Sequence, residues 1–313
     1  MKKESTNKIV YVMLLFLTAV IWGIAFVFQA VGAEYVSPMT FLAWRSWIAC
    51  IALIPVILWR RHKNPAIHAE SEQTASDSEH SGLKKSPVFR GLVSGSLCCG
   101  TFLFLASFSQ QTGIAYTTAG KAGFITALYV VLVPVISQLF GKKQPLFIWL
   151  SVALGVAGLY LLSIKGGFEL GFGDALMVLC ALLFSFQILS VNHFVAKVDG
   201  VMLACGEFFV EAVMATVGMC LFEQVTAQGL KAALPAILYA GLFSSGVGYT
   251  LQIVAQSKVE PTIASLIMCL ESVFSALAGW AILHESMTIR EFAGALLMFL
   301  AVVLSQLPHK NKQ

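Results

Sequence analysis

Residues 9–31 read IVYVMLLFLTAVIWGIAFVFQAV, twenty-three positions without a charged side chain. A helix of that length crosses the roughly 30 Å of hydrocarbon in a bilayer. Lys2, Lys3 and Lys8 precede the run, and Val31 with Ala33 imitates a signal-peptidase site. The apolar region of a signal peptide is only about 7–15 residues long, however. Because nine similar runs follow, residues 9–31 predict a first transmembrane helix.

The composition of the whole chain points to lipid as its solvent. Apolar residues make up 58% of the 313 positions, charged residues only 12%, and the mean hydropathy is +0.82. A soluble domain has about 45–50% apolar and about 25% charged residues. The apolar runs are continuous rather than alternating, which favours helices over the strands of a barrel. The net charge of +4 is modest, so a lipid bilayer is the expected partner and nucleic acid is not.

Ten runs are long enough to cross the membrane as helices. They lie near 9–31, 38–59, 88–110, 116–139, 146–163, 173–194, 200–222, 232–254, 260–283 and 288–306. The expected fold class is therefore an all-α membrane protein with ten transmembrane helices.

Lysine and arginine positions predict the orientation. With a cytoplasmic N-terminus, 15 of these residues fall on inside segments and 3 on outside segments. The inside residues are Lys2, Lys3, Lys8, Arg60, Arg61, Lys63, Lys84, Lys85, Arg90, Lys142, Lys143, Lys197, Lys258, Lys310 and Lys312; the outside residues are Lys165, Lys231 and Arg290. The positive-inside rule thus predicts a multi-pass protein of the cytoplasmic membrane with both termini cytoplasmic. Residues 60–87 are polar, with little to bury, and predict a disordered cytoplasmic linker.

The hydropathy pattern also repeats. Spans 1 and 2 fall on spans 6 and 7 after a displacement of 162 residues, and spans 3–5 fall on spans 8–10 after 143. We expect residues 1–59 and 88–165 to form one five-helix repeat and residues 170–308 the other. Because five is odd, the second repeat enters from the opposite side, which makes an inverted pair and favours a solute site near the midplane.

The chain resembles the EamA type of the drug/metabolite transporter superfamily over nearly its whole length. In the first half the resemblance lies in AVIWG at 19–23, in residues 41–47 around Arg45, and in GKAGFIT at 120–126 through Pro134. In the second half it lies in LESVF at 270–274, Gly279–Trp280, His284–Glu285 and Gly294. Family members usually have Gly-Glu after the ninth span, where His284 here replaces the glycine. The resemblance implies ten helices in two repeats around a central cavity, and secondary transport of small metabolites.

Signatures of enzymes and cofactors are missing from the sequence. A P-loop, an H-E-x-x-H helix and a G-x-S-x-G turn are all absent. The seven cysteines lie in apolar spans without metal-binding spacing, so packing is their expected role. We expect no enzymatic activity, no cofactor and no metal.

Ionisable residues inside apolar spans are the candidates for a binding site, because each is costly in lipid unless it faces a cavity or a partner. Glu271 lies near the middle of span 9, and Glu207 and Glu211 share one face of span 7. Arg45 and Lys121 would attract carboxylates or pair with the glutamates. Aromatic walls are expected from Trp22, Tyr129 and Tyr249. The alternative for every charge is a structural ion pair that fixes helix register.

The expected function is secondary transport of a small organic metabolite or drug-like solute by alternating access, as an exporter or exchanger. A membrane-embedded enzyme would need a His/Asp/Ser cluster near one interface, which is not found. A channel stays open as an alternative, and so does a homodimer. The substrate, the coupling ion and the direction do not follow from the sequence.

Overall fold

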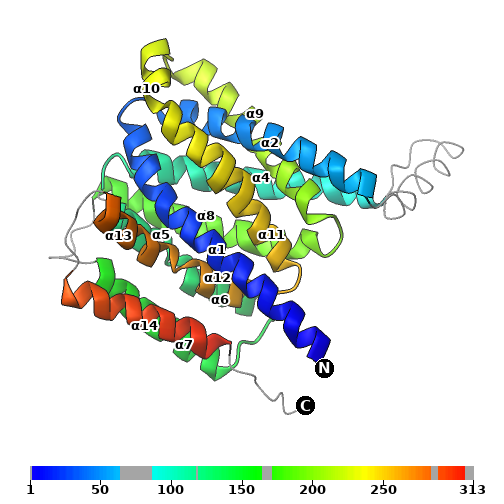
Figure 1. Cartoon of the computed structure of the whole chain (residues 1–313), viewed down its shortest axis with the longest axis vertical. Helices are drawn as coiled ribbons and strands as arrows, with labels where there is room; N and C mark the ends of the chain where they lie inside the picture. The colour runs from blue at the N-terminus through cyan, green and yellow to red at the C-terminus, as the bar shows by residue number, and fades with distance from the viewer. Residues whose placement is uncertain (1, 64–86, 118, 164–170, 283–287, 307–313) are drawn as a thin grey trace, which may run out of the picture.

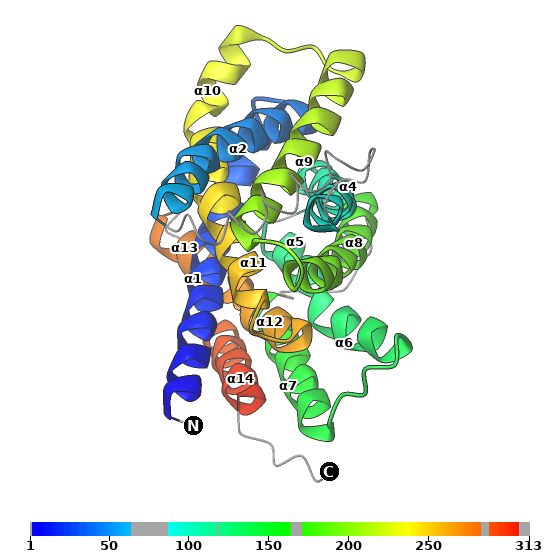
Figure 2. The same ribbon diagram turned by 90° about the vertical axis from the view of Figure 1, so that its right-hand side faces the viewer.

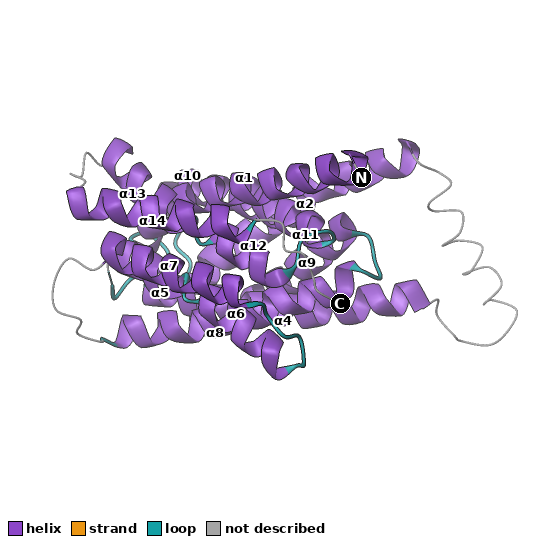
Figure 3. Cartoon of the chain, turned by 90° about the horizontal axis from the view of Figure 1, so that it is seen from below, coloured by secondary structure: helices purple, strands orange, loops and turns teal. Residues whose placement is uncertain are grey.

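The computed structural model is a bundle of helices, and it describes residues 2–63, 87–117, 119–163, 171–282 and 288–306. Figure 3 shows these helices running alongside one another, joined by short loops. The first half contains α1 (Lys2–Ala33), α2 (Pro38–Lys63), α4 (Pro87–Gly113), α5 (Ala119–Thr126), α6 (Tyr129–Leu139) and α7 (Leu146–Ser163). The second half contains α8 (Phe172–Val195), α9 (Gly200–Phe222), α10 (Ala227–Leu238), η1 (Tyr239–Tyr249), α11 (Thr250–Gln256), α12 (Pro261–Met268), α13 (Glu271–Ile282) and α14 (Ile289–Ser305).

Each of the ten predicted spans is occupied by helix. Three of them are composite: 116–139 contains α5 and α6, 232–254 contains α10, η1 and α11, and 260–283 contains α12 and α13. In the described part of the chain, eight helical stretches are long and apolar enough to cross a membrane. The remaining two spans are α7 and the 17-residue α14, which are near the lower limit of about 17 residues. The predicted all-α class is confirmed.

The packing of the helices follows a two-fold pattern. Helix α2 lies along α9, and α7 lies along α14, which Figures 1 and 2 both show. Helix α4, which is span 3, packs on α8, which is span 6. Moving both on by five gives spans 8 and 1, and α1 does pack on α10, η1 and α11. Likewise α1 packs on α13, which joins spans 1 and 9, and α8 packs on α5 and α6, which joins spans 6 and 4. Moving both members of a contact on by five spans, with span 1 following span 10, therefore gives another contact, as two five-helix repeats require.

Glycines allow the closest of these contacts. A Cβ on Gly294 would lie 2.5 Å from the carbonyl oxygen of Gly158, so α7 and α14 touch through their backbones. A Cβ on Gly100 would lie 2.7 Å from the oxygen of Glu207, and one on Gly241 would lie 2.9 Å from the oxygen of Arg45. Arg45 and Glu207 stand 162 residues apart, so these last two contacts are counterparts in the two halves.

Spans 4 and 9 are each broken in the middle. Between α5 and α6 the amide of Val130 donates to Ala127 at 3.0 Å, and between α12 and α13 the amide of Ser272 donates to Cys269 at 3.2 Å. Both bonds reach back three residues instead of four, which tightens the turn. Pro134 lies inside α6, beyond the first break, and its ring crowds the carbonyl of Val130 one turn before it. The second break contains no proline; there the Cys269 thiol donates to the Leu266 carbonyl at 3.0 Å.

Some predictions concern residues outside the described ranges. Most of the predicted linker, residues 64–86, lies there, as do residues 164–170, His284 and Glu285. The disorder of the linker and the boundaries of the two repeats therefore stay predictions.

Candidate functional site

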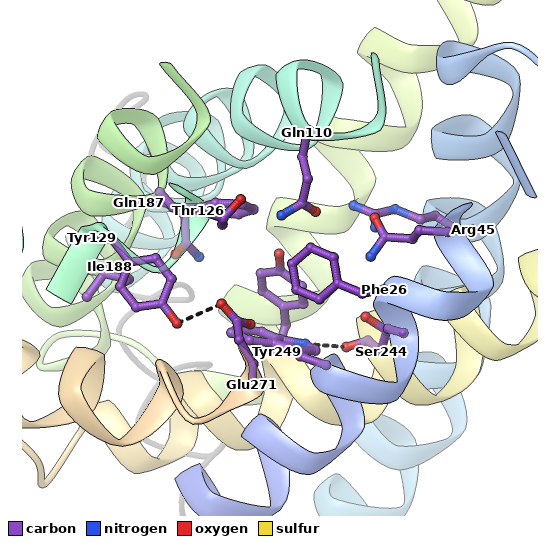
Figure 4. A pocket seen from close by; sticks show the side chains of 14 residues that line it. Phe26, Arg45, Gln110, Thr126, Tyr129, Gln187, Ile188, Ser244, Tyr249 and Glu271 are labelled. Atoms are coloured by element: carbon purple, nitrogen blue, oxygen red, sulfur yellow. Dashed lines mark hydrogen bonds between the residues drawn. The ribbon is translucent and has the colours of Figure 1, made fainter. Parts of the chain in front are cut away.

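A small cavity lies at the centre of the bundle, where the two broken spans meet helices from both halves (Figure 4). Its volume of about 30 Å³ is room for about two water molecules. The lining side chains are Trp22, Ala25, Phe26, Gln29, Arg45, Gln110, Thr126, Tyr129, Phe184, Gln187, Ile188, Ser244, Tyr249 and Glu271. They come from eight elements, so relative movement of the helices would reshape the cavity.

Glu271 and Tyr129 face each other across this cavity. Glu271 is the first residue of α13, Tyr129 is the first residue of α6, and the tyrosine hydroxyl donates to Glu271 Oε1 at 2.9 Å. Glu271 is only 4% exposed, and Oε2, its other oxygen, has no hydrogen-bond partner among the described residues. The helix breaks bring both side chains to the cavity, as discontinuous helices do in other transporters.

Aromatic side chains form one part of the remaining wall. The rings of Trp22 and Tyr249 lie 4.5 Å apart, and Phe208 packs edge-on against Tyr249. The indole of Trp22 donates to the carbonyl of Ser244 at 3.2 Å, which fixes its orientation. The carboxyl group of Glu271 beside the rings of Trp22 and Tyr249 is suited to bind a ligand with an apolar body and a cationic end.

Arg45 also lines the cavity, but its charge is already matched. One guanidinium nitrogen lies 3.0 Å from Glu211 and also donates to Ser107 at 2.8 Å. Ser46 donates to the second oxygen of Glu211 at 2.9 Å. Both partners are buried, so the pair ties α2 to α9 beside the cavity. Glu211 itself is not among the lining residues.

Glu207 lies one turn before Glu211 on α9 and is fully buried. One of its oxygens accepts a hydrogen bond at 3.2 Å from Gln187, which lines the cavity; the other has no donor among the described residues. The side chain of Lys121 lies outside those that the structure describes, although its backbone belongs to α5.

The structure thus places the predicted site residues in two groups. Glu271, Tyr129, Tyr249, Trp22 and Arg45 line one cavity, whereas Glu211 and Glu207 support its lining residues from behind.

Sequence reasoning missed several lining residues. These are Ala25, Phe26, Gln29, Gln110, Thr126, Phe184, Gln187, Ile188 and Ser244. The repeat held a usable signal. Trp22 and Phe184 stand 162 residues apart, and so do Phe26 and Ile188, so the predicted displacement relates lining residues of α1 to lining residues of α8.

Two wider hollows lie at the ends of the bundle. We call the first the basic vestibule; its volume is about 530 Å³, and it is lined by Ser137, Lys142, Lys143, Gln144, Asn192, Gln256, Ser257, Lys258, Val259, Glu260 and Pro261. The second, the opposite vestibule, measures about 350 Å³ and includes Glu34, Thr40, Gln111 and Gln224. No group of three or more described His, Cys, Asp or Glu side chains could hold a metal ion.

Comparison with known sequences identifies relatives over the whole chain. The profile of the EamA-like transporter family matches twice, over residues 9–164 and 171–307. A protein of Archaeoglobus fulgidus named an uncharacterized transporter is 30% identical over 296 residues, covering 93% of this chain and 84% of its own. An uncharacterized inner membrane transporter of Escherichia coli strain K12, YedA, is 22% identical, covering 93% and 88%.

Comparison with solved structures supports the same architecture. One crystal structure aligns with a TM-score of 0.73, covering 95% of this chain and 96% of its own. Its sequence identity of 16% means that the likeness concerns the fold alone.

Proposed function

Because the chain belongs to the EamA-like transporter family, we propose that it is a secondary carrier that moves a small organic amine across the cytoplasmic membrane by alternating access. The proposal extends to proton exchange, with Glu271 binding either a proton or the amine. The observation that carries it is the buried carboxyl of Glu271, held by Tyr129 on one oxygen and facing the central cavity with the other.

The balance of charge around the cavity favours a cationic solute. Arg45 is neutralised by Glu211, and no described lysine or arginine pairs with Glu271. A buried carboxyl without a cation is stable only when it carries a proton or meets a cation in the cavity. A primary amine supplies that cation and three donors, and the rings of Trp22 and Tyr249 accommodate an apolar body.

Exchange of protons for the amine follows from the same carboxyl of Glu271. If one carboxyl binds both the proton and the amine, each displaces the other, and a proton gradient then drives the amine in the reverse direction. Export of the amine at the expense of inward proton movement is the direction we propose. The lysines of the basic vestibule support a cytoplasmic location for that face.

The closed centre disfavours a channel. A cavity of about 30 Å³ leaves no room for an organic solute without movement of the helices, whereas the vestibules on both sides are more than ten times larger. A carrier needs such an occluded form.

Purified protein in detergent can test the competition between proton and amine. A thermal-shift screen with a panel of primary amines and matched alcohols selects the ligand, and a pH-indicator dye in weakly buffered solution then records the protons released on adding it. We expect release by the wild type and none by Glu271→Gln, which keeps the size of the side chain and removes its charge. Glu260→Gln, a change at the rim of the basic vestibule, should release protons as the wild type does.

Transport in proteoliposomes completes the test. A pH gradient should drive amine accumulation by the wild type but not by Glu271→Gln. Normal uptake by a folded Glu271→Gln protein would refute the assignment. If that variant does not fold, the carboxyl is structural, and the proposal also fails.

A further inference from the structure

Buried glutamines separate the central cavity from the basic vestibule. Gln187 lines the cavity, Gln256 lines the vestibule, and Gln252 lies between them. The amide nitrogen of Gln252 donates to Gln187 Oε1 at 3.3 Å and to Gln256 Oε1 at 3.1 Å. Gln256 in turn donates to the carbonyl of Ile188 at 3.1 Å, which ties α11 to α8. All three glutamines are at most 2% exposed, so this chain closes the route.

A second glutamine contact lies on the other side of the cavity. Gln29 lines the cavity and Gln111 lines the opposite vestibule. The amide nitrogen of Gln111 donates to the carbonyl of Gln29 at 3.1 Å, which joins α4 to α1. Gln111 is 1% exposed and Gln29 is 5% exposed. This barrier contains one hydrogen bond between side chain and backbone, whereas the first contains three linked amides.

The two barriers occupy corresponding places in the two halves. One joins spans 1 and 3, and the other joins spans 6 and 8, which is the same pair moved on by five. In both, a glutamine of the later span donates to a backbone carbonyl of the earlier one. Gln110, next to Gln111, stands 142 residues before Gln252, the same separation as between Tyr129 and Glu271.

Each barrier also contains a buried oxygen that the closed form leaves unsatisfied. The side-chain oxygens of Gln111 and Gln252 have no donor among the described residues. A buried acceptor without a donor is destabilising, and water that enters when the barrier opens would satisfy it. Both barriers are therefore held closed by hydrogen bonds and at the same time predisposed to open.

We propose that Gln187, Gln252 and Gln256 form the gate on the basic side, and that Gln29 and Gln111 form the gate on the opposite side. This inference rests on the proposed carrier function and assigns the residues that open and close in its cycle. The segment next to the first gate supports movement there: η1 is a π-helix that continues directly into α11, and π-helical turns are frequent at functional sites.

Accessibility of a cavity residue can test both gates. A reporter cysteine replaces Ser244, which lines the cavity, in a chain whose seven native cysteines are changed to serine or alanine. An impermeant cationic methanethiosulfonate then reacts from either face, in right-side-out and inside-out vesicles. The reagent is larger than the closed cavity, so its rate of reaction reports how often each gate opens.

Truncating one gate should favour opening on its own side. Gln252→Ala removes two hydrogen bonds and leaves two acceptors without that donor, so we expect labelling from the basic face to rise about tenfold and labelling from the opposite face to fall. Gln111→Ala removes one bond and should do the reverse, by about fivefold. Gln138→Ala, at an exposed position of α6, is the matched control and should leave both rates unchanged.

The outcomes separate this inference from the proposed function. If side-dependent labelling of the parent protein responds to amine or pH while the gate variants match the control, the gates are wrong and the carrier stands. Labelling from both faces at once, unaffected by amine or pH, would overturn the carrier itself. Should Gln252→Ala not reach the membrane, Gln256→Ala removes the bond to Ile188 and must give the same shift toward the basic face.

Discussion

The two halves of the chain share their backbone breaks but differ in the side chain placed at them. Residues 127–128 interrupt span 4 and residues 269–270 interrupt span 9, at equivalent points. The helix after the first break begins with Tyr129, and the helix after the second begins with Glu271. These two residues meet in the centre, 142 positions apart, as donor and acceptor of one hydrogen bond.

The same contrast occurs between α2 and α9. Arg45 and Glu207 stand 162 residues apart at equivalent positions, yet one is a cation in a buried ion pair and the other is a carboxyl bonded to Gln187. The packing of glycines under them is nearly the same. The repeat therefore determines which backbone positions lie beside the central cavity, while divergence between the halves determines which side chain stands there and what it contacts.

The largest expected difference between the two halves is the face of the membrane on which equivalent residues lie, because the halves should have opposite orientations. His62 at the end of α2 and Gln224 beyond α9 stand 162 residues apart and should lie on opposite faces of the membrane. We expect a cysteine at Gln224 to react with impermeant maleimide in intact cells, and a cysteine at His62 to react only after permeabilisation. Reaction of both from the same side would show that the repeats are not inverted.

The next largest difference should be in stability, between the loss of a buried carboxyl that is paired with a cation of α2 and the loss of one that is not. Glu211→Gln leaves the guanidinium of Arg45 without its anion, and breaking a buried pair costs about 3–5 kcal/mol. Glu207→Gln removes a carboxyl that has no cation, so we expect a change below about 1 kcal/mol.

Thermal unfolding in detergent measures the difference between these variants. The double change Arg45→Gln with Glu211→Gln removes both charges and should recover part of the loss. Equal destabilisation by the two single changes at Glu207 and Glu211 would contradict the distinction between paired and unpaired sites.

The ten spans could be predicted because each apolar run is a local property of the sequence. Glu271 could be singled out for the same reason, since an ionisable residue in an apolar run needs an explanation wherever its partner lies. Its partner could not be identified. Tyr129 is one of seven tyrosines, and only the breaks of α5–α6 and α12–α13 bring it to the carboxyl.

The register of the repeat was predicted less well, and η1 supplies the reason. Gly100 and Gly241, which make equivalent contacts, are 141 residues apart, whereas Gln110 and Gln252 are 142 apart. A π-helix accommodates an extra residue, and the part of η1 that follows Gly241 lies between these two positions in span 8. A single displacement of 143, read from hydropathy, could not reveal an insertion that depends on how the helix is wound.

The difference between the two breaks should also appear in the pH dependence of amine binding. Tyr129→Phe keeps the ring and removes the hydroxyl that Glu271 accepts from, so the carboxyl loses a hydrogen bond worth about tenfold in equilibrium. We expect the pH at which the amine displaces protons to shift while expression stays normal. Tyr160→Phe, at a half-exposed position of α7 outside the cavity, is the matched control and should leave the pH profile unchanged. Equal pH profiles for wild type and Tyr129→Phe would remove Tyr129 from the site.

The two ends of the α2–α9 pair offer the smallest contrast. At one end the carboxylate of Glu223 accepts bonds from the amides of Met39 and Thr40 at 2.8 and 2.7 Å, and so caps α2. At the other end Arg60 pairs with Asp199 at 3.1 Å, but both side chains are about 40% exposed. A cap that satisfies amides at a helix start stabilises by about 1 kcal/mol, whereas an exposed ion pair contributes about 0–1 kcal/mol.

We therefore expect Glu223→Ala to lower the thermal midpoint in low salt and in 1 M salt alike, and Arg60→Ala to lower it slightly and only in low salt. A larger loss for Arg60→Ala would mean that the exposed end, and not the capped one, holds the two repeats in register.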